Sequence, residues 1–97
     1  PVILMGDFNV TPDQPLISEL NRSMEDGYEG TITSPFGPVG TFTGFKVSEI
    51  PERRIDYIFV SKNDLIIKKY AALAHLQDLR YPSDHFPVMV ELSFKKK

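Results

Sequence analysis

The sequence predicts an α+β fold, in which a mostly antiparallel sheet carries at least one helix. Two observations support this class. One segment repeats apolar residues at helical spacing, whereas several others are short, apolar and rich in β-branched or aromatic side chains. Most of these extended segments follow one another through short turns, and strands joined in this way usually pair antiparallel. The length of 97 residues suits one small domain.

The first half of the chain is predicted to contain a strand and a helix. Residues 1–5 are an apolar run that is typical of a buried strand. Thr11 is expected to cap a helix with Pro12 at its first position, and apolar spacing predicts that helix over about residues 12–24. The remaining predictions here are a short strand over 28–33, an extended stretch at 41–43, and loops at 34–40 and 47–53.

The second half of the chain is predicted to be mostly extended. Residues 55–60 are dominated by β-branched and aromatic side chains, which favour a strand. A turn at 62–64 then predicts a hairpin-like connection to a strand over 65–74. A loop over 77–83 leads to the last strand, 88–94, where apolar and polar residues alternate.

Two strands look apolar on both faces, which predicts a second covering layer. They contain "VILM" at 2–5 and "IFV" at 58–60. The chain also opens inside an apolar strand, so we expect it to be a piece of a longer protein.

Composition excludes several classes of function. The net charge of −2 and the pI of about 5.6 leave no sequence-wide basic footprint for nucleic acid, although a local patch stays open. Cysteine is absent, which excludes disulfides, thiolate catalysis and cysteine-based zinc sites. No apolar run approaches the roughly 20 residues of a membrane helix.

Polar residues interrupt the ends of otherwise apolar strands. They are Asp7, Asn9, Asp56, Asp84 and His85. Asp7 or Asn9 alone would be ordinary turn chemistry, and Ser-Asp-His at 83–85 could form an Asx-turn. Asp56 is different, because it interrupts a strong strand where aspartate is disfavoured and a buried carboxylate needs a partner. That partner is a neighbouring arginine (Arg53 or Arg54) or a histidine.

His85 is the better of the two histidines as a partner for Asp56. It stands at a strand start beside Asp84, whereas His75 has apolar neighbours and is interpreted as a packing or surface residue. A carboxylate that accepts one ring N–H fixes the tautomer of an imidazole and raises the basicity of the other nitrogen. The oxygen-rich set as a whole suits Mg²⁺ or Mn²⁺, which predicts attack of water on a phosphate ester.

Three motifs then occur in order: "GDFN" at 6–9, "RIDYIFVS" at 54–61 and "SDHFPV" at 83–88. Together they resemble the C-terminal half of the endonuclease/exonuclease/phosphatase superfamily. That superfamily includes pancreatic deoxyribonuclease, abasic-site endonucleases, sphingomyelinases, inositol polyphosphate 5-phosphatases and deadenylases. The resemblance implies a four-layer α/β sandwich, of which residues 1–97 would be a partial domain. This chain would supply about one sheet and its helix, without the N-terminal half.

The resemblance also implies a role for each matching residue. Asp7 would orient or deprotonate the attacking water, and it would lie near the metal. Asn9 would hydrogen-bond a phosphate oxygen, also near the metal. His85 would contact the scissile phosphate or act as the base, and Asp56 would orient it. Asp84 would bind the metal directly or through water.

The residues that the resemblance places in the N-terminal half are absent here. They are the principal metal-binding Glu, an Asn and a second His. The glutamates of this chain (Glu19, Glu25 and Glu49) are interpreted as surface charges. We therefore expect the parent protein to be a metal-dependent phosphoester hydrolase and this chain alone to be inactive or weak.

Substrate and partners are only weakly constrained. Phe42 and Phe45 in "GTFTGF" could stack on a substrate ring, or they could plug the edge of the sandwich. The acidic pI favours a small phosphorylated or lipid-phosphate substrate over a long nucleic acid. A second hypothesis is a non-catalytic module that dimerises through an exposed apolar sheet face. The sequence does not indicate a cellular compartment.

Overall fold

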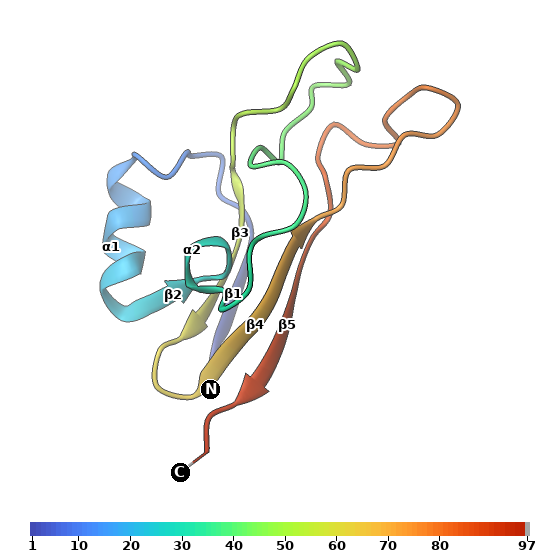
Figure 1. Ribbon diagram of the computed structural model, residues 1–97. Helices are drawn as coiled ribbons and strands as arrows, with labels where there is room; N and C mark the ends of the chain where they lie inside the picture. The colour runs from blue at the N-terminus through green and yellow to red at the C-terminus, as the bar shows by residue number, and fades with distance from the viewer. Residues whose placement is uncertain (97) are drawn as a thin grey trace.

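A computed structural model describes residues 1–96 (Figure 1). Within these residues two helices accompany five strands, and every strand pairing is antiparallel, so the predicted α+β class is confirmed. The elements are β1 (Ile3–Asp7), α1 (Pro15–Ser23), β2 (Met24–Asp26), α2 (Gly27–Gly30), β3 (Asp56–Ser61), β4 (Leu65–Ala72) and β5 (Val88–Phe94). Neither described helix has the length and apolar character that a membrane crossing requires.

The strands are divided between two sheets. The first sheet has the order β1-β3-β2, with β3 at its centre, and the second consists of β4 and β5. The segment after α2 runs along the other side of β4, where the Ile32 N–H donates to the Ile67 carbonyl at 2.9 Å and the Phe36 N–H to the Tyr70 carbonyl at 2.9 Å. The expectation that the chain forms about one sheet is therefore wrong.

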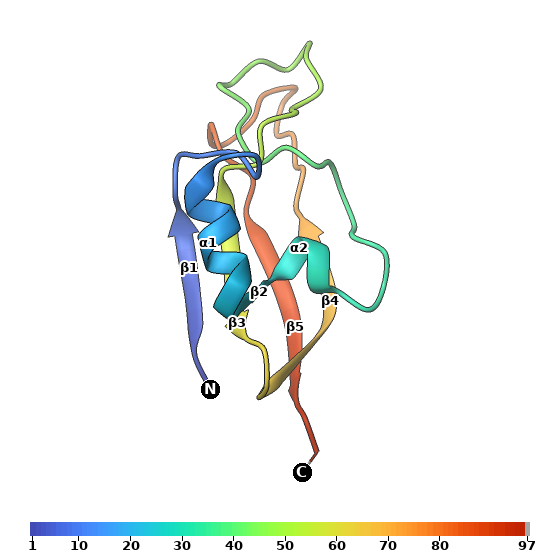
Figure 2. The ribbon, with the colours of Figure 1, turned by 90° about the vertical axis from the view of Figure 1, so that its left-hand side faces the viewer.

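Strand β3 is the core of the molecule because its two faces are buried against different layers. Tyr57 and Phe59 pack on one face with Ile17 of α1, and Ile58 and Val60 pack on the other with residues of β4 and β5. This alternation is the two-residue period of a strand. The layers are thus helix α1, the first sheet and the second sheet; Figure 2 shows α1 in front of β1 and β3.

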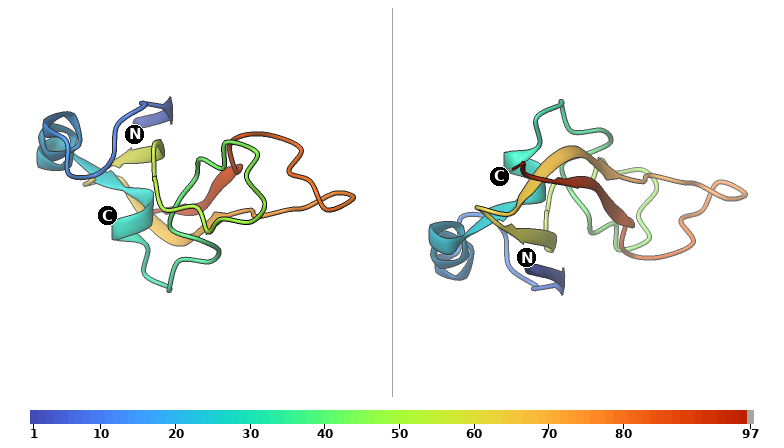
Figure 3. Two further views of the ribbon diagram at one scale, coloured as in Figure 1. Left: turned by 90° about the horizontal axis from the view of Figure 1, so that it is seen from above. Right: turned by 90° about the horizontal axis from the view of Figure 1, so that it is seen from below.

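Three loops meet at one end of the molecule. The loop after β1, the loop that precedes β3 and the loop between β4 and β5 lie at the end opposite to both chain termini (Figures 1 and 3). The polar residues that the sequence singles out belong to these loops or to the strand ends beneath them.

The predicted strands at 55–60, 65–74 and 88–94 are confirmed, and for the last of them the observed first and last residues match the prediction. The hairpin-like connection between the first two is wrong, because β3 and β4 pair in different sheets. The difference arises because β3 is apolar on both faces and buries both of them. The chain therefore turns at 62–64 and places β4 over one of these faces, instead of adding β4 to the same sheet.

Two further predictions in the first half are corrected. The helix starts at Pro15, three residues after the predicted start, because Gln14 is extended (φ −82°, ψ 149°), as residues before proline tend to be. The predicted strand at 28–33 is replaced by β2 and the short helix α2. There the Asp26 carboxylate accepts the Tyr28 N–H at 3.0 Å and caps the turn.

Strand β1 also differs from its predicted burial. All five of its residues are exposed, including Ile3 at 48% and Met5 at 63%. The second sheet covers β3 but does not extend over β1, which is the outer strand of its own sheet. Its apolar sequence therefore faces solvent in this chain.

Candidate active site

Two carboxylates face each other across the first sheet. Asp7 is the last residue of β1 and Asp56 the first of β3, and the antiparallel register places them directly opposite. The Asp7 carboxylate accepts the Asn9 N–H at 2.8 Å, and Asn9 adopts a left-handed conformation (φ 55°) that asparagine tolerates. Like charges opposite each other destabilise a sheet, so this pair indicates a place for a positive group.

His85 provides a group that joins these two carboxylates. Its Nδ1 lies 2.8 Å from Asp56 Oδ2, which is hydrogen-bond distance. Its Nε2 lies 3.8 Å from Asp7 Oδ2 and 3.9 Å from Asp84 Oδ1. With Nδ1–H donating to Asp56, Nε2 is the nitrogen that faces Asp7 and Asp84, and it is the one available to a ligand.

The loop before β5 holds His85 through backbone contacts. The His85 N–H donates to Ser83 Oγ at 3.1 Å, and the Phe86 N–H donates to the Thr41 carbonyl at 2.7 Å. Phe42 pairs with His85 in an isolated antiparallel bridge, and their rings meet edge to face at 5.3 Å. The extended stretch predicted at 41–43 is thus found only as this single bridge, but it lies against the imidazole.

Thr41 supports the site, and sequence reasoning missed it. Its side chain is fully buried, and its Oγ1 accepts the N–H groups of Ile55 at 3.0 Å and Asp56 at 3.2 Å. The hydroxyl therefore completes the backbone hydrogen bonding at the point where β3 begins and Asp56 projects. A weak signal was present, since Thr41 and Thr43 alternate around Phe42 as inward positions of a short strand do.

The charges around His85 favour its protonated form. The hydrogen bond that His85 donates to the Asp56 carboxylate raises the pKa of His85 above its usual 6.5. Partial burial opposes this rise, and the negative charges of Asp56, Asp7 and Asp84 add to it. The imidazole retains 27% side-chain exposure, whereas Asp56 retains 17%. Asp56 is thus the inner partner, and His85 is the one that solvent reaches.

The donor set fits a hard divalent cation. One ligand atom each from Asp7, Asp56 and His85 lie within 4.8 Å of one another, and the Asp84 carboxylate is adjacent. Carboxylate oxygens are the ligands that Mg²⁺ and Mn²⁺ prefer. The resemblance implied that Asp7, Asn9 and Asp84 lie at the metal. Of these, Asp7 belongs to the described cluster together with Asp56 and His85, Asp84 is adjacent to it, and Asn9 is exposed.

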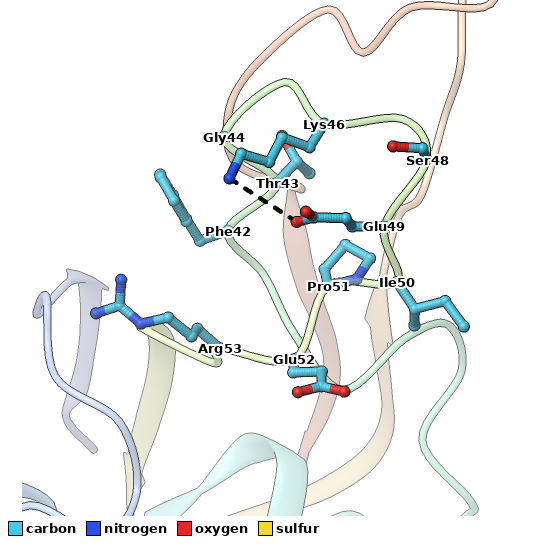
Figure 4. Close-up of a pocket in the computed structure, with 10 residues that line it drawn as sticks. All are labelled: Phe42, Thr43, Gly44, Lys46, Ser48, Glu49, Ile50, Pro51, Glu52 and Arg53. Carbon is cyan, nitrogen blue, oxygen red and sulfur yellow. Dashed lines mark ion pairs between the residues drawn. The ribbon is translucent and has the colours of Figure 1, made fainter.

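The two candidate substrate-stacking residues differ in position. Phe42 contacts His85 and also lines a cavity of about 750 Å³, whose other lining residues are 43, 44, 46 and 48–53 (Figure 4). Phe45 is 59% exposed and does not line this cavity. Of the other residues considered, His75, Glu19 and Glu49 are exposed, and Glu25 is half-buried on β2.

A family model described as "Endonuclease/Exonuclease/phosphatase family" matches residues 1–85. No curated protein matches the chain significantly.

Solved structures are also similar to the chain. A mannosyl-6-phosphatase from Bacteroides thetaiotaomicron is 37% identical with a TM-score of 0.81, and the match covers 95% of this chain and 37% of that one. A conserved protein of unknown function from Enterococcus faecalis is 30% identical with a TM-score of 0.86, covering 96% and 36%. An endonuclease/exonuclease/phosphatase from Bacteroides vulgatus is 26% identical with a TM-score of 0.80, covering 96% and 36%. The chain spans about a third of the length of these structures.

Proposed function

Because this chain belongs to the endonuclease/exonuclease/phosphatase family, we propose that it supplies part of the active site of a metal-dependent phosphoester hydrolase. The observation that carries the proposal is His85, which hydrogen-bonds Asp56 through one ring nitrogen and presents the other to Asp7. A carboxylate-oriented imidazole beside a free carboxylate can activate a water molecule by general-base catalysis, as attack on a phosphate needs.

Each residue of the cluster has a proposed role in this reaction. Asp7 orients the attacking water or accepts its proton, since its second carboxylate oxygen is directed at His85 Nε2. His85 binds the scissile phosphate or acts as the base, and Asp56 positions it. Asn9 donates a hydrogen bond to a phosphate oxygen.

Asp7, Asp84 and Asn9 are proposed to hold a Mg²⁺ or Mn²⁺ ion together with Asp56. When bound, such an ion neutralises the charge that develops on the phosphate. The fit rests on the oxygen-rich donor set described above.

The proposed substrate is a phosphate ester on a small molecule. A similar solved structure is named a mannosyl-6-phosphatase, which supports a phosphorylated sugar. The acidic pI of about 5.6 gives no general attraction to a polyanion, although nucleic acid and lipid phosphates remain alternatives.

The chain is proposed to hold a partial site. It spans about a third of the similar structures, and we propose that residues 1–97 form part of one endonuclease/exonuclease/phosphatase domain. The remaining metal-binding carboxylate would then come from outside these residues. Hydrolysis by this chain alone is expected to be weak, so metal binding is the better first test.

Paramagnetic Mn²⁺ titrated into the 97-residue chain tests this proposal by NMR. We expect signals of Asp7, Asp56 and His85 to broaden first, Mg²⁺ to reverse the effect by competition, and Asp7→Asn to weaken it by about 10-fold or more. Glu49→Gln, at an exposed carboxylate of another loop, is the control and should change nothing. Broadening that is strongest elsewhere, or equal in the Asp7→Asn variant, would overturn the assignment.

A second candidate function is a module that associates through its exposed sheet. The observation in its favour is β1, whose apolar residues Ile3, Leu4 and Met5 are between 38% and 63% exposed. Such a surface drives association. A strictly monomeric chain would count against this candidate, whereas it would leave the hydrolase proposal intact.

A further inference from the structure

Arg53 is a cation beside the candidate site that has no role so far. Its guanidinium carbon lies 5.9 Å from the centre of the Phe42 ring, and that ring is in turn 5.3 Å from the ring of His85. One aromatic ring therefore separates the guanidinium from the imidazole. Figure 4 shows the Arg53 side chain extending away from Glu52 toward the part of the molecule where β1, in blue, ends.

The backbone fixes this position more firmly than an exposed side chain alone would suggest. The Arg53 carbonyl accepts the N–H of Thr41 at 2.9 Å and that of Phe42 at 3.3 Å. Thr41 in turn holds the N–H of Asp56 through its hydroxyl. The backbone of Arg53 is therefore hydrogen-bonded to Phe42, whose ring contacts His85. Through Thr41 it is also linked to the start of β3, which carries Asp56.

The charge of Arg53 is available to a ligand. The side chain is exposed, and the ion pairs found within 4.0 Å among the described residues do not include it. Its neighbour Arg54 is different, since Arg54 is buried and its guanidinium donates to both carboxylate oxygens of Asp26. Arginine presents a planar fork of N–H donors that matches phosphate oxygens two at a time.

We propose that Arg53 binds the non-bridging oxygens of the substrate phosphate and so favours a phosphate monoester over a diester. This inference rests on the proposed hydrolase function and specifies its substrate class. The site contains the carboxylates of Asp7, Asp56 and Asp84, which repel an anion. A monoester, whose second pKa is about 6, carries nearly two negative charges at neutral pH, whereas a diester carries one. The more highly charged ligand gains more from an additional fixed cation.

Arg53→Gln keeps a polar side chain of similar length and removes the charge. Because the residue is exposed, the variant should retain the fold. Arg53→Lys keeps the charge and removes the fork. Arg80→Gln, at an exposed arginine of the loop between β4 and β5, is the matched control.

The experiment titrates inorganic phosphate and, separately, dimethyl phosphate into the chain with Mg²⁺ present, and follows both by NMR. We expect phosphate to shift the Arg53 side-chain, Phe42 and His85 signals. Arg53→Gln should weaken phosphate binding by about 10–100-fold, Arg53→Lys by less, and Arg80→Gln not at all. Dimethyl phosphate should bind more weakly than phosphate and depend less on Arg53.

Three results would overturn the role of Arg53: no phosphate shift in the wild-type chain, equal binding by wild type and Arg53→Gln, or equal dependence of both ligands on Arg53. The Mn²⁺ titration is independent of these results. Metal broadening at Asp7 without an Arg53 effect would leave the hydrolase proposal standing and remove only this inference. An Arg53 effect without metal broadening would leave Arg53 as a phosphate-binding residue, but it would overturn the metal-dependent hydrolase proposal and with it the assigned substrate class.

Discussion

At the residue scale, the pairing of Asp56 with His85 decides how the site responds to pH. The hydrogen bond that His85 donates to the Asp56 carboxylate raises the pKa of His85 in the folded state, and the charges of Asp7 and Asp84 act in the same direction. A histidine with a raised folded-state pKa binds its proton more tightly in the folded chain than in the unfolded one. Its contribution to stability is therefore complete below the unfolded value of about 6.5 and is lost as pH rises through the folded value.

Asp56→Asn should lower the pKa of His85 and reduce this pH dependence, because only the charges of Asp7 and Asp84 would still favour the imidazolium. The amide keeps the shape of the carboxylate but loses the charge that stabilises the imidazolium. We expect the ring protons of His85, followed by NMR in metal-free buffer, to titrate above 6.5 in the wild-type chain and at lower pH in the variant. Asp78→Asn, at an exposed loop position, is the control and should leave the titration of His85 unchanged. An unshifted midpoint in Asp56→Asn would refute the assigned hydrogen bond.

The sequence singled out the charged residues of this cluster, but it did not identify the residue that holds their backbone in place. Asp56 was conspicuous because a carboxylate inside a strong strand needs a partner, and that argument leads to a histidine or an arginine. Thr41 was not anticipated, because a buried threonine is ordinary in an extended segment and its hydroxyl reaches Ile55 and Asp56 only through tertiary folding. Local sequence cannot show which strand start a hydroxyl 15 residues away will meet.

At the element scale, one buried ion pair ties β2 to the start of β3. Arg54 donates to both carboxylate oxygens of Asp26, at 3.0 and 2.7 Å, and both side chains are 2% exposed. The guanidinium also lies over the rings of Tyr28 at 4.6 Å and Tyr57 at 4.8 Å. Since Asp26 caps α2 as well, a single carboxylate orders the junction of three elements.

Asp26→Asn should destabilise the chain by about 3–5 kcal/mol, because it leaves the buried guanidinium without a counter-charge. The change in unfolding free energy is measured by urea denaturation followed by circular dichroism. Glu19→Gln is the matched control. It removes one carboxylate of the exposed Glu19–Arg22 pair, and the expected loss is below about 1 kcal/mol. Equal losses of unfolding free energy in the two variants would show that the buried ion pair stabilises the fold no more than the exposed pair does.

The Asp26 carboxylate also explains one element that the sequence did not predict. Residues 28–33 have a weak strand pattern, but the Asp26 cap turns the chain into α2 directly after β2. The helix starts at Pro15 rather than at Pro12 for a different local reason. Pro15 restricts the residue before it, so Gln14 is extended and the helix begins only after it. By contrast, β3 and β5 were predictable, since their alternating or β-branched patterns match the faces that they bury.

At the scale of the whole molecule, one sheet face continues beyond the core without a cover. The register pairs Ile3 with Val60 and Met5 with Ile58, so Ile3 and Met5 share the face on which the second sheet packs. That sheet buries Ile58 and Val60 but leaves Ile3 and Met5 exposed. The apolar pattern of residues 2–5 predicted a buried strand, whereas β1 is exposed among the described residues. A sequence pattern indicates that a face is apolar, but it does not specify which part of a chain covers that face.

Self-association of the chain is the expected consequence of this uncovered face. Strand β1 also has an unpaired edge, because it bonds only to β3 within its sheet, and an exposed apolar edge strand favours pairing with a second copy. We expect light scattering after size exclusion to give a mass that rises with protein concentration. The double variant Ile3→Lys/Met5→Lys should weaken the association by about 10-fold or more, since each substitution replaces apolar surface with charge. Leu79→Lys, at a more exposed apolar residue of the loop between β4 and β5, should leave association unchanged. A constant monomer mass at every concentration would contradict the expectation and the association function together, whereas equal weakening by Leu79→Lys would place the contact on the loops instead of on β1.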